Sequence, residues 1–380
     1  MKVFNLGRIP IKSWADEVED EALEQAINLS NLPFAYSHIA LMADVHVGFG
    51  MPIGGVLASK GVIIPNAVGV DIGCGIIAAK TDIRDINIKQ IKNIVDKAHN
   101  TIPLGYKHHK RPREWKEFDN PPKSEVVFEE LEASRYQLGT LGGGNHFISI
   151  EQGSDGHIWL MVHSGSRNFG YKIANYYNKI ANEINKEIKL SPLKQDLAGL
   201  YIDSEEGEEY FIAMNYALEF AKENRNQLLE QFYTIFREET DSYKILQKID
   251  IHHNYAAIET HFGEEVIVHR KGAIKAKLGE LGIIPGSMGT PSYIVEGLGN
   301  EESFNTCSHG AGRVMSRKMA NKLITKEMAD KAMEGIVHKG WRGDLSEAPM
   351  AYKDIEEVII NQKDLVKPVV KLTPLGVVKG

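Results

Sequence analysis

The stretch GVIIPNAVGVDIGCGIIAAKTDI, residues 61–83, consists of two apolar runs separated by a glycine-rich segment. Short apolar runs bounded by glycine favour buried strands, so the stretch predicts a strand, a glycine-rich loop and a second strand. The loop carries Asp71 and Cys74, and Cys74 is one of only two cysteines in the chain. Glycine lets the backbone approach a bound group closely, and loops at strand ends are common positions for active sites. This segment is therefore central to both the fold and the candidate site.

The same two patterns continue on either side of this segment. Apolar positions at helical spacing predict helices at 17–29, 88–98, 169–188, 209–238 and 352–360, and apolar runs predict strands at 34–44, 157–167 and 264–274. The connection at 191–209, which contains Pro192, is expected at the surface. We predict an α+β fold in which residues 1–380 form one large domain with mixed β-sheets flanked by helices. A helical insertion is expected at about 169–240.

Composition excludes several classes of protein. The chain has 380 residues, of which 43% are apolar and 25% charged, as in ordinary globular proteins. It contains no apolar run of about 18 residues that could span a membrane, and its N-terminus lacks the pattern of a secretory signal. Two cysteines favour a reducing, cytoplasmic location. The net charge of −7 argues against a generally basic surface, although a local basic groove stays open.

Three more glycine-rich or polar turns carry side chains that bind metals. His146 lies in LGGGNHF, His163 in VHSGSRN and His253 in HHNYA. Taken alone, a cysteine after a strand is usually a small buried hydrophobe, and a histidine at a strand end is usually structural. The joint pattern is harder to explain in that way. One carboxylate, one thiolate and three imidazoles exceed the needs of one four-coordinate ion, and they suit two ions of Mn²⁺, Fe²⁺, Co²⁺ or Zn²⁺ better than Mg²⁺ or Ca²⁺.

A candidate nucleophile lies in CSHGAGRVMSRKMA, residues 307–320. A helix is expected to begin just after His309, and the N-terminus of a helix attracts phosphate and disfavours a charged imidazole. Arg313 and Arg317 are expected on one face of that helix. A neutral histidine beside two arginines and a metal pair could accept a nucleotidyl group. A capping histidine on a helix with solvated arginines explains the local pattern equally well.

Two other segments suit nucleotides or RNA. In PGSMGTPSY, residues 285–293, Ser287 and Ser292 could donate hydrogen bonds to a nucleotide, although serine-glycine turns are common and mostly inert. The loop GYKHHKRPREWK, residues 105–116, interleaves cations with Tyr106 and Trp115. Cations follow an RNA backbone and aromatic rings stack on bases, which suits single-stranded RNA ends. A solvated basic loop is the alternative.

In chain order, these segments resemble a known family. GVDIGCG, LGGGNHF, HSGSR, HNYA, HRKGA, PGSMGT, SHGAGR, WRGD with EAP and AYKD, and a terminal KG are together similar to the RtcB family of RNA-splicing ligases. The resemblance extends from MADVHVGFGMPIGG at residue 42 to the end of the chain. It implies a central metal and nucleotide cleft. It also implies the joining of 2′,3′-cyclic phosphate or 3′-phosphate ends to 5′-hydroxyl ends, with GTP and two Mn²⁺ ions.

The resemblance also implies partners and residue roles. The RNA would be tRNA halves or another cleaved transcript, and some relatives use an archease-type activator. His309 would carry GMP, Asp44 would orient it, and Asn145 would lie beside the guanylate phosphate. The implied metal ligands are Asp71, Cys74, His146, His163 and His253. The nucleotide site would include Asn145, Ser287, Ser292, His309, Gly310, Gly312, Tyr352 and Lys379, and the phosphate contacts would be Arg167, Arg313 and Arg317.

One block departs from the family pattern. The family usually has a glutamate that contacts guanine two positions after the phenylalanine of GNHF, and this chain has Ser149 there, with Glu151 two residues later. Residues two apart on a strand share a face, so Glu151 is expected to compensate in part from about 7 Å away. Two alternatives to a ligase also follow from the residues. One is a two-metal phosphodiesterase or phosphatase in which His309 is an acid or base, and the other is an RNA-end binding protein without catalysis.

Overall fold

The computed structural model describes residues 1–191, 196–341 and 343–380. Pro192 of the expected surface connection and Arg342 of the WRGD motif lie outside the described residues. Within this part of the chain, none of the helices has both the length and the apolar character needed to cross a membrane.

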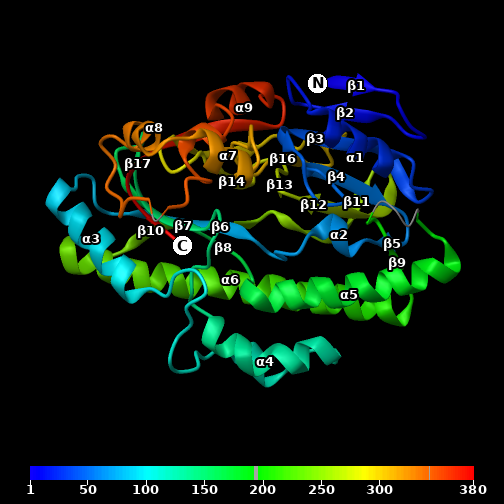
Figure 1. Ribbon diagram of the computed structural model, residues 1–380, viewed down its shortest axis with the longest axis horizontal. Coiled ribbons are helices and arrows are strands. Elements are labelled where there is room, and N and C mark those ends of the chain that lie inside the picture. Colours follow the sequence, from blue (N-terminus) through cyan, green and yellow to red (C-terminus); the bar gives the residue numbers. More distant parts are fainter. Residues whose placement is uncertain (192–195, 342) are drawn as a thin grey trace.

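Two large sheets form the centre of the molecule (Figure 1). The six-stranded sheet contains, in spatial order, β1 (Lys2–Phe4), β2 (Ile11–Ser13), β3 (Ala35–His46), β4 (Ile53–Ser59), β12 (Glu264–Lys271) and β11 (Asn254–His261). The seven-stranded sheet contains β10 (Ile245–His252), β6 (Gly75–Thr81), β8 (Ile158–Ser164), β7 (Phe147–Gly153), β17 (Val366–Lys379), β15 (Ser292–Gly297) and β14 (Leu281–Ile284). Only the β2–β3 pair is parallel among the neighbours in these two sheets.

Two small sheets and the helices complete the fold. The small sheets pair β13 (Ala273–Lys275) with β16 (Thr306–Ser308), and β5 (Val62–Ile63) with β9 (Leu200–Tyr201). The helices are α1 (Asp20–Ser30), α2 (Pro65–Val68), α3 (Ile88–Thr101), α4 (Glu125–Gln137), α5 (Arg167–Ile188), α6 (Glu205–Glu239), α7 (Arg317–Leu323), α8 (Lys326–Ala332) and α9 (Ile355–Asn361). Short 3₁₀ turns lie at Lys116–Asp119, Glu301–Ser303 and Pro349–Ala351.

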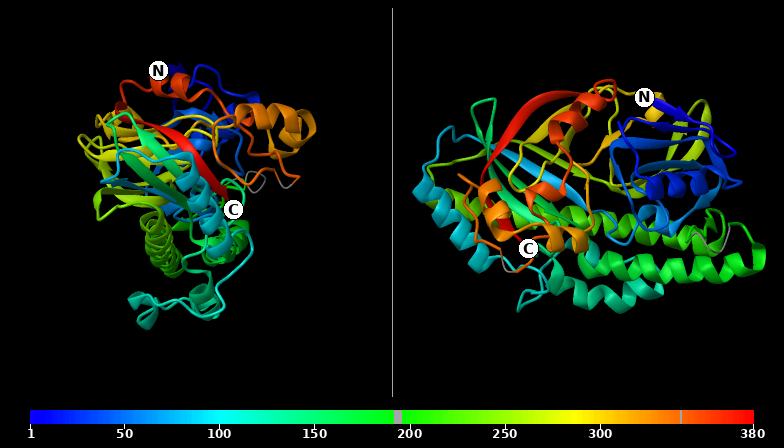
Figure 2. Two further views of the ribbon diagram at one scale, coloured as in Figure 1. Left: turned by 90° about the vertical axis from the view of Figure 1, so that its left-hand side faces the viewer. Right: turned by 45° about the horizontal axis from the view of Figure 1, so that its top comes forward.

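The long helices α5 and α6 lie side by side beneath the strands, and α4 lies beyond them (Figures 1 and 2). Helix α6 packs Leu228, Phe232 and Phe236 against the outer face of the seven-stranded sheet. In the N-terminal half of the same helix, Tyr210, Met214 and Phe220 join a cluster with residues of α4, α5 and the six-stranded sheet. One helix therefore supports both sheets.

The opening stretch shows why strand β6 is almost entirely apolar. On β6, Ile76 and Ala78 face a cluster inside the curved sheet, whereas Ile77 and Ala79 face the helices. Because side chains alternate along a strand, burial of both faces requires a continuous apolar run. The inner cluster includes residues of both edge strands, β10 and β14, so the sheet curls until these edges approach each other.

The predicted α+β fold is confirmed, with mixed sheets flanked by helices. Strands and helices occur near most predicted positions, but two expectations fail. The glycine-broken loop of residues 61–83 also contains the one-turn helix α2, and α4 was not predicted. The single domain of residues 1–380 and its helical insertion stay predictions.

Candidate metal and nucleotide site

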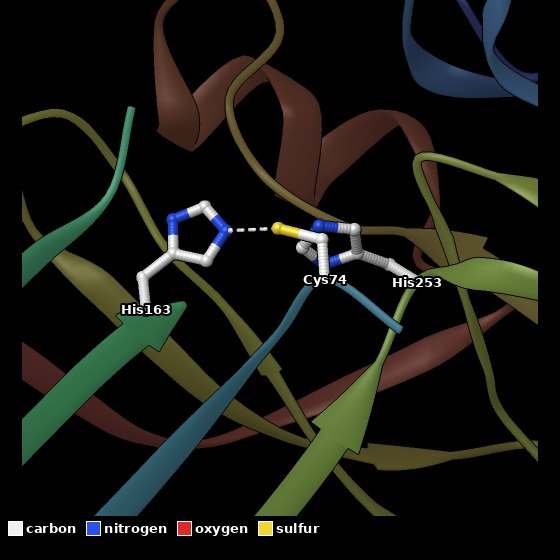
Figure 3. A group of neighbouring side chains, drawn as sticks. All are labelled: Cys74, His163 and His253. Atoms are coloured by element: carbon white, nitrogen blue, oxygen red, sulfur yellow. Dashed lines mark hydrogen bonds between the residues drawn. The ribbon is translucent and has the colours of Figure 1, made fainter. Parts of the chain in front are cut away.

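Five side chains of the predicted ligand set form a row between the sheets. Cys74 Sγ lies 3.3 Å from both His146 Nε2 and His163 Nε2, and His146 Nε2 lies 3.1 Å from Asp71 Oδ2. The ligand atoms of Asp71, Cys74 and His146 lie within 4.8 Å of one another, and so do those of Cys74, His163 and His253. Cys74 belongs to both groups, and Figure 3 shows it between His163 and His253.

Neighbouring strand ends bring these residues together. Asp71 and Cys74 lie in the turn before β6, His146 immediately precedes β7, and His163 lies on β8. Strand β8 pairs with both β6 and β7, so the three ends coincide at one edge. His253 lies between β10 of the seven-stranded sheet and β11 of the six-stranded sheet. The ligand row therefore crosses from one sheet to the other.

The protonation states suit a cation. Burial lowers the pKa of both His163 and His253, which keeps these imidazoles neutral. His146 Nδ1 donates to the carbonyl of Leu141 at 3.1 Å, which leaves Nε2 as its ligand atom. Burial acts to raise the pKa of Asp71, but the neighbouring His146 and Cys74 side chains outweigh it and keep the carboxylate ionised.

A buried nitrogen without a hydrogen-bond partner and the thiol of Cys74 also fit a bound metal. His253 Nδ1 is buried without a hydrogen-bond partner in the described structure. Burial and the neighbouring Asp71 raise the pKa of the Cys74 thiol, and a bound cation would reverse that effect because a coordinating thiol loses its proton. The mixed oxygen, nitrogen and sulfur donors suit Mn²⁺, Fe²⁺, Co²⁺ or Zn²⁺.

Two polar residues of α6, missed by the sequence analysis, support the turns that carry the ligands. Arg225 is fully buried and donates to the carbonyl of Gly73 at 2.7 Å and to Asp250 at 2.7 Å. Asn224 accepts from the backbone N–H of Gly139 at 2.7 Å and donates to Ser164 Oγ at 3.0 Å. The available signal was their position on the apolar face of α6, where buried polar residues need partners.

His309 lies at the other end of the row. Its ring centroid is 4.7 Å from that of His253. Its Nδ1 donates to Asp44 Oδ2 at 2.7 Å, and the same oxygen accepts from the backbone N–H groups of His309 and Gly310. Burial acts to raise the pKa of Asp44, but His309 outweighs it and lowers that pKa, so Asp44 stays ionised. With Nδ1 held in this way, Nε2 is the nitrogen left to react.

The expected helix after His309 is wrong in position. His309 follows strand β16, and α7 begins only at Arg317, capped by Ser316. Gly312 adopts a φ of 73°, and a Cβ there would lie 2.3 Å from the carbonyl oxygen of Asp44, so the chain turns at this glycine. The orientation of His309 therefore depends on Asp44 and not on a helix N-terminus. Arg313 precedes α7, so it does not share a helix face with Arg317.

A cavity of about 140 Å³ adjoins His309. The predicted nucleotide-site residues that line it are Asn145, Ser287, His309, Gly310, Gly312, Tyr352 and Lys379, together with Arg313 and Arg317. Ser292 is not among the lining residues, because its buried hydroxyl accepts from the N–H of Gly286 at 3.2 Å and supports the serine loop from within. Arg167 is not among them either, and lies on the Asp71 side of the row.

Glu347 is a lining residue that was not predicted. Its buried carboxylate accepts from Arg317 at 2.9 Å and Arg313 at 3.2 Å, and it pairs closely with the hydroxyl of Tyr352. The glutamate lies in the EAP segment, which contributed to the resemblance but received no role. It holds both arginines at the cavity wall.

Glu151 does not compensate for Ser149 in the way that was expected. Both side chains are buried inside the curved seven-stranded sheet, with exposures of 2% and 1%, and neither lines the cavity beside His309. Glu151 Oε2 and Ser149 Oγ have no hydrogen-bond partner in the structure as described. Burial raises the pKa of Glu151 to about 8, so this carboxyl is neutral at pH 7.

Comparison with known proteins matches almost the entire chain. The family model described as tRNA-splicing ligase RtcB matches residues 25–128 and 114–380. RNA-splicing ligase RtcB of Escherichia coli (strain K12) is 40% identical over 401 residues, covering 98% of this chain and 97% of that protein. tRNA-splicing ligase RtcB of Pyrobaculum aerophilum is 32% identical and that of Thermococcus kodakarensis 30% identical, each covering 98% of this chain and 95% of its own.

Proposed function

Because this chain belongs to the RtcB family of RNA-splicing ligases, we propose that it joins RNA ends through a nucleotide carried covalently on His309. Membership of this family makes it an RNA ligase of tRNA splicing or RNA repair. The finer proposal names the ends and the cofactors. They are a 2′,3′-cyclic phosphate or 3′-phosphate end, a 5′-hydroxyl end, GTP and two Mn²⁺ ions.

The observation that carries the proposal is the pairing of His309 with Asp44. A histidine is a nucleophile only through a nitrogen with a free lone pair, and Asp44 holds the proton on Nδ1 at 2.7 Å. Asp44 also stabilises the positive charge that develops on the ring when Nε2 forms a bond, as a buried carboxylate does beside a catalytic histidine.

In the first step, His309 Nε2 attacks the α-phosphorus of GTP. An N–P bond forms, the bond from that phosphorus to the pyrophosphate oxygen breaks, and pyrophosphate leaves. Arg313, Arg317 and Lys379 line the cavity at this point, and their charges complement the phosphate oxygens. Glu347 fixes the two arginines in place before the nucleotide arrives.

In the later steps, an oxygen of the RNA 3′-phosphate attacks the phosphorus on His309, and His309 is released as GMP passes to the RNA. Where the RNA ends in a 2′,3′-cyclic phosphate, water opens it to the 3′-phosphate before this transfer. The 5′-hydroxyl oxygen then attacks the activated 3′-phosphorus, its proton passes to water, and GMP leaves with the electrons of the broken P–O bond.

Asp71, Cys74, His146, His163 and His253 would hold the metal, and Cys74 belongs to both groups of candidate ligands. Cations held there supply charge stabilisation for the attacking and leaving oxygens of a phosphoryl transfer. The orphaned Nδ1 of His253 and the neutral imidazoles support this assignment.

GTP labelled at the α-phosphate tests the covalent step. We expect a label on the protein that is stable in alkali, labile in acid and absent from His309→Ala. His309→Asn is a matched variant, because it keeps a polar side chain but has no nucleophilic nitrogen. Labelling of either variant would overturn the proposal, and so would ligation without a labelled intermediate.

The nucleotide itself is tested by replacing labelled GTP with ATP. Ser149 is buried and does not line the cavity beside His309, and the carboxylate that does line this cavity belongs to Glu347. Labelling from GTP alone supports the proposed cofactor, whereas equal labelling from ATP would contradict it and would point to the loss of the glutamate at position 149.

The proposed partners are RNA ends, either tRNA halves or another cleaved transcript, and an archease-type activator. Multiple-turnover ligation of a 2′,3′-cyclic phosphate strand to a 5′-hydroxyl strand, with and without an added archease, measures this dependence. Release of a free 3′-phosphate strand without any joined product would favour the phosphodiesterase alternative.

A further inference from the structure

Lys353, in the AYKD segment, is hydrogen-bonded to the backbone on both sides of the Asp44–His309 pair. Its Nζ donates to the carbonyl of Val45, the residue after Asp44, at 2.7 Å. Its backbone N–H donates to the carbonyl of Gly312 at 3.0 Å, within the turn that follows His309. One residue is therefore bonded both to the strand that carries the acid and to the turn that carries the nucleophile.

The pairing of strands does not fix Asp44 on its own. Strand β3 pairs with β4 at Leu41 and again at His46, and the register is irregular between these two residues. The carboxylate of Asp44 is held through Oδ2, because Oδ1 is buried without a hydrogen-bond partner among the described residues. The place of Oδ2 therefore depends on where the backbone of residues 44 and 45 lies.

The turn after His309 packs against the same backbone. A Cβ on Gly312 would lie 2.3 Å from the carbonyl oxygen of Asp44, so the turn approaches this closely only because the residue is glycine. Beside this contact, Arg313 and Tyr352 form an antiparallel bridge. The segment that supplies the lysine is thus aligned with the turn, and its side chain extends from there to β3.

Lys353 also brings a positive charge into a buried region. Burial lowers the pKa of Lys353, and the negative charges of Asp44 and Glu19 act in the opposite direction. Burial likewise acts to raise the pKa of Asp44, whereas His309 and Lys353 act to lower it. A buried carboxylate needs positive charge nearby, and Lys353 supplies part of that charge from outside the reacting pair.

The lysine lies apart from the nucleotide site. Lys353 is not among the described residues that line the cavity beside His309. It lies on a separate cavity of about 440 Å³, together with Asp16 and Glu17, and Tyr352 borders both cavities. Any effect of this lysine on the reaction must therefore pass through the groups that it holds.

We propose that Lys353 is a positioning residue for the covalent step, which sets the distance and direction between Asp44 and His309 by holding their two backbone segments together. The inference rests on the proposed function, in which His309 Nε2 attacks the α-phosphorus. A shift of the strand end would lengthen the 2.7 Å bond from Nδ1 to Asp44 and turn Nε2 away from the phosphorus. A misplacement of about 1 Å can cost about 100-fold in rate, even when the substituted residue is far from the chemistry.

Single-turnover labelling of the full chain over a range of GTP concentrations tests the proposal. Lys353→Met removes the ammonium group but keeps an unbranched side chain, and we expect its maximal labelling rate to fall by about 10- to 100-fold. The GTP concentration at half-maximal rate should stay within about threefold of that of the wild type, because Lys353 does not line the nucleotide cavity. Lys353→Arg keeps the charge and the donor, so it should restore most of the lost rate.

Two comparisons separate positioning from a general loss of stability. The matched control is Lys371→Met, because Lys371 donates to Glu356 Oε1 at the surface at 2.6 Å, and this variant should be labelled at the wild-type rate. In the Asp44→Asn background, Lys353→Met should slow labelling much less than it does in the wild type, since residues that act through one contact are not additive. Urea unfolding shows that each variant is folded, and Lys353→Gln replaces Lys353→Met if the latter is not.

Three results would overturn the proposal. The first is a wild-type labelling rate in Lys353→Met or, where it is used instead, in Lys353→Gln. The second is a loss of rate as large in the Asp44→Asn background as in the wild type, because the lysine would then act independently of Asp44. The third is a change confined to the GTP concentration at half-maximal rate, which would place Lys353 in nucleotide binding.

A spectroscopic measurement separates failure of this inference from failure of the proposed function. The proton on His309 Nδ1 should give a slowly exchanging signal in nitrogen-15 histidine NMR without nucleotide, assigned by its absence from His309→Asn. We expect the signal to persist in Lys353→Arg and to be lost to exchange in Lys353→Met. An unchanged signal in Lys353→Met contradicts the positioning role, whatever the labelling shows. If the signal depends on Lys353 but wild-type protein takes no label from GTP, the covalent step alone is wrong.

Discussion

The two large sheets contribute different chemistry to the same site. The seven-stranded sheet presents Cys74, His146 and His163, which are buried side chains with both imidazole Nε2 atoms 3.3 Å from Cys74 Sγ. The six-stranded sheet presents Asp44 on β3, which orients His309 by a charged hydrogen bond. The seven-stranded sheet therefore provides neutral or weakly basic donor atoms that suit a cation. The six-stranded sheet provides the carboxylate that holds the proton of His309 on Nδ1.

We expect this difference to separate the proposed metal binding from the orientation of His309. The Asp44–His309 pair is made by contacts within the protein, since Asp44 Oδ2 accepts from the imidazole Nδ1 and from the backbone N–H groups of His309 and Gly310. The ligand row, by contrast, leaves His253 Nδ1 unpaired and Cys74 with a raised pKa, so it is incomplete without a cation. Variants on either side should therefore have effects that can be told apart.

The largest effect is expected from Asp44→Asn. An asparagine can hold the imidazole in place but cannot stabilise its positive charge, and it favours the wrong tautomer. The rate of nucleotide attachment to His309 should fall by about 10²- to 10⁴-fold, as in other histidine–aspartate pairs. Single-turnover labelling with GTP measures this rate, and metal titration of the same variant should show binding close to that of the wild type. If the metal affinity of the variant falls by the same factor as its labelling rate, metal binding and the orientation of His309 are not separate.

The next effect is expected from Cys74→Ser. If Cys74 is a metal ligand as proposed, the hydroxyl is a poor substitute for its thiolate, and Mn²⁺ affinity should fall by at least about 100-fold. Isothermal titration or electron paramagnetic resonance of free Mn²⁺ measures the affinity. The chain offers a matched control in Cys307→Ser, since Cys307 is equally buried but lies outside the ligand row. If both variants bind Mn²⁺ alike, Cys74 is not a ligand.

A smaller effect is expected from Arg225→Lys. Lysine keeps the charge but cannot reach Asp250 and the carbonyls of Gly73 and Ser164 together. The turn that holds Cys74 should loosen, with metal affinity about tenfold weaker, the usual cost of losing support behind a ligand. The variant Lys222→Arg on the exposed side of α6 controls for changes in charge distribution. An unchanged affinity would show that the ligand turn is rigid without α6.

The smallest effect on activity is expected from Glu151→Gln, which should change the free energy of unfolding instead. Burial raises the pKa of Glu151 from 4.5 to about 8 in the folded chain. Between these pH values the folded state keeps a proton on Glu151 that the unfolded state releases. The neutral carboxyl therefore makes a contribution to the stability of the fold that is fully present below about pH 4.5 and is lost as the pH rises through 8. Glutamine cannot ionise, so the variant should be more stable than the wild type at pH 8.5 by on the order of 3 kcal/mol, with little difference at pH 5.

Urea unfolding at both pH values measures the difference. Glu132→Gln on the exposed face of α4 is the control, because its side chain is 73% exposed and its free energy of unfolding should not depend on pH in this way. Equal stability of Glu151→Gln and the wild type at pH 8.5 would mean that Glu151 has a partner or that it is hydrated.

Local patterns in the sequence were enough for many of these features. The continuous apolar run of β6 predicts a strand covered on both faces, and glycine-rich turns mark Asp71, Cys74, His146 and His163 as candidate ligands. Their meeting at one edge follows from the pairing of β8 with β6 and β7, a non-local fact that the sequence alone did not provide.

The features that were missed depend on contacts between distant parts of the chain. Arg225 meets Gly73 across 152 positions, and Glu347 meets Arg313 across 34. The late start of α7 has a local cause, since Ser316 caps the helix and Gly312 turns the chain against Asp44. The glycines of SHGAGR favoured a helix start in the sequence analysis, whereas close backbone packing is what requires Gly312.

The position of His253 between β10 and β11 has a consequence for how the protein is assembled. His253 N–H donates to the carbonyl of Cys74 at 2.8 Å, so the β10–β6 pair of the seven-stranded sheet already places this imidazole beside the thiol, and the chain then passes directly into the six-stranded sheet. A cation held by Cys74 and His253 would bind at the point where the chain passes from one sheet to the other, and it would therefore oppose separation of the two sheets there.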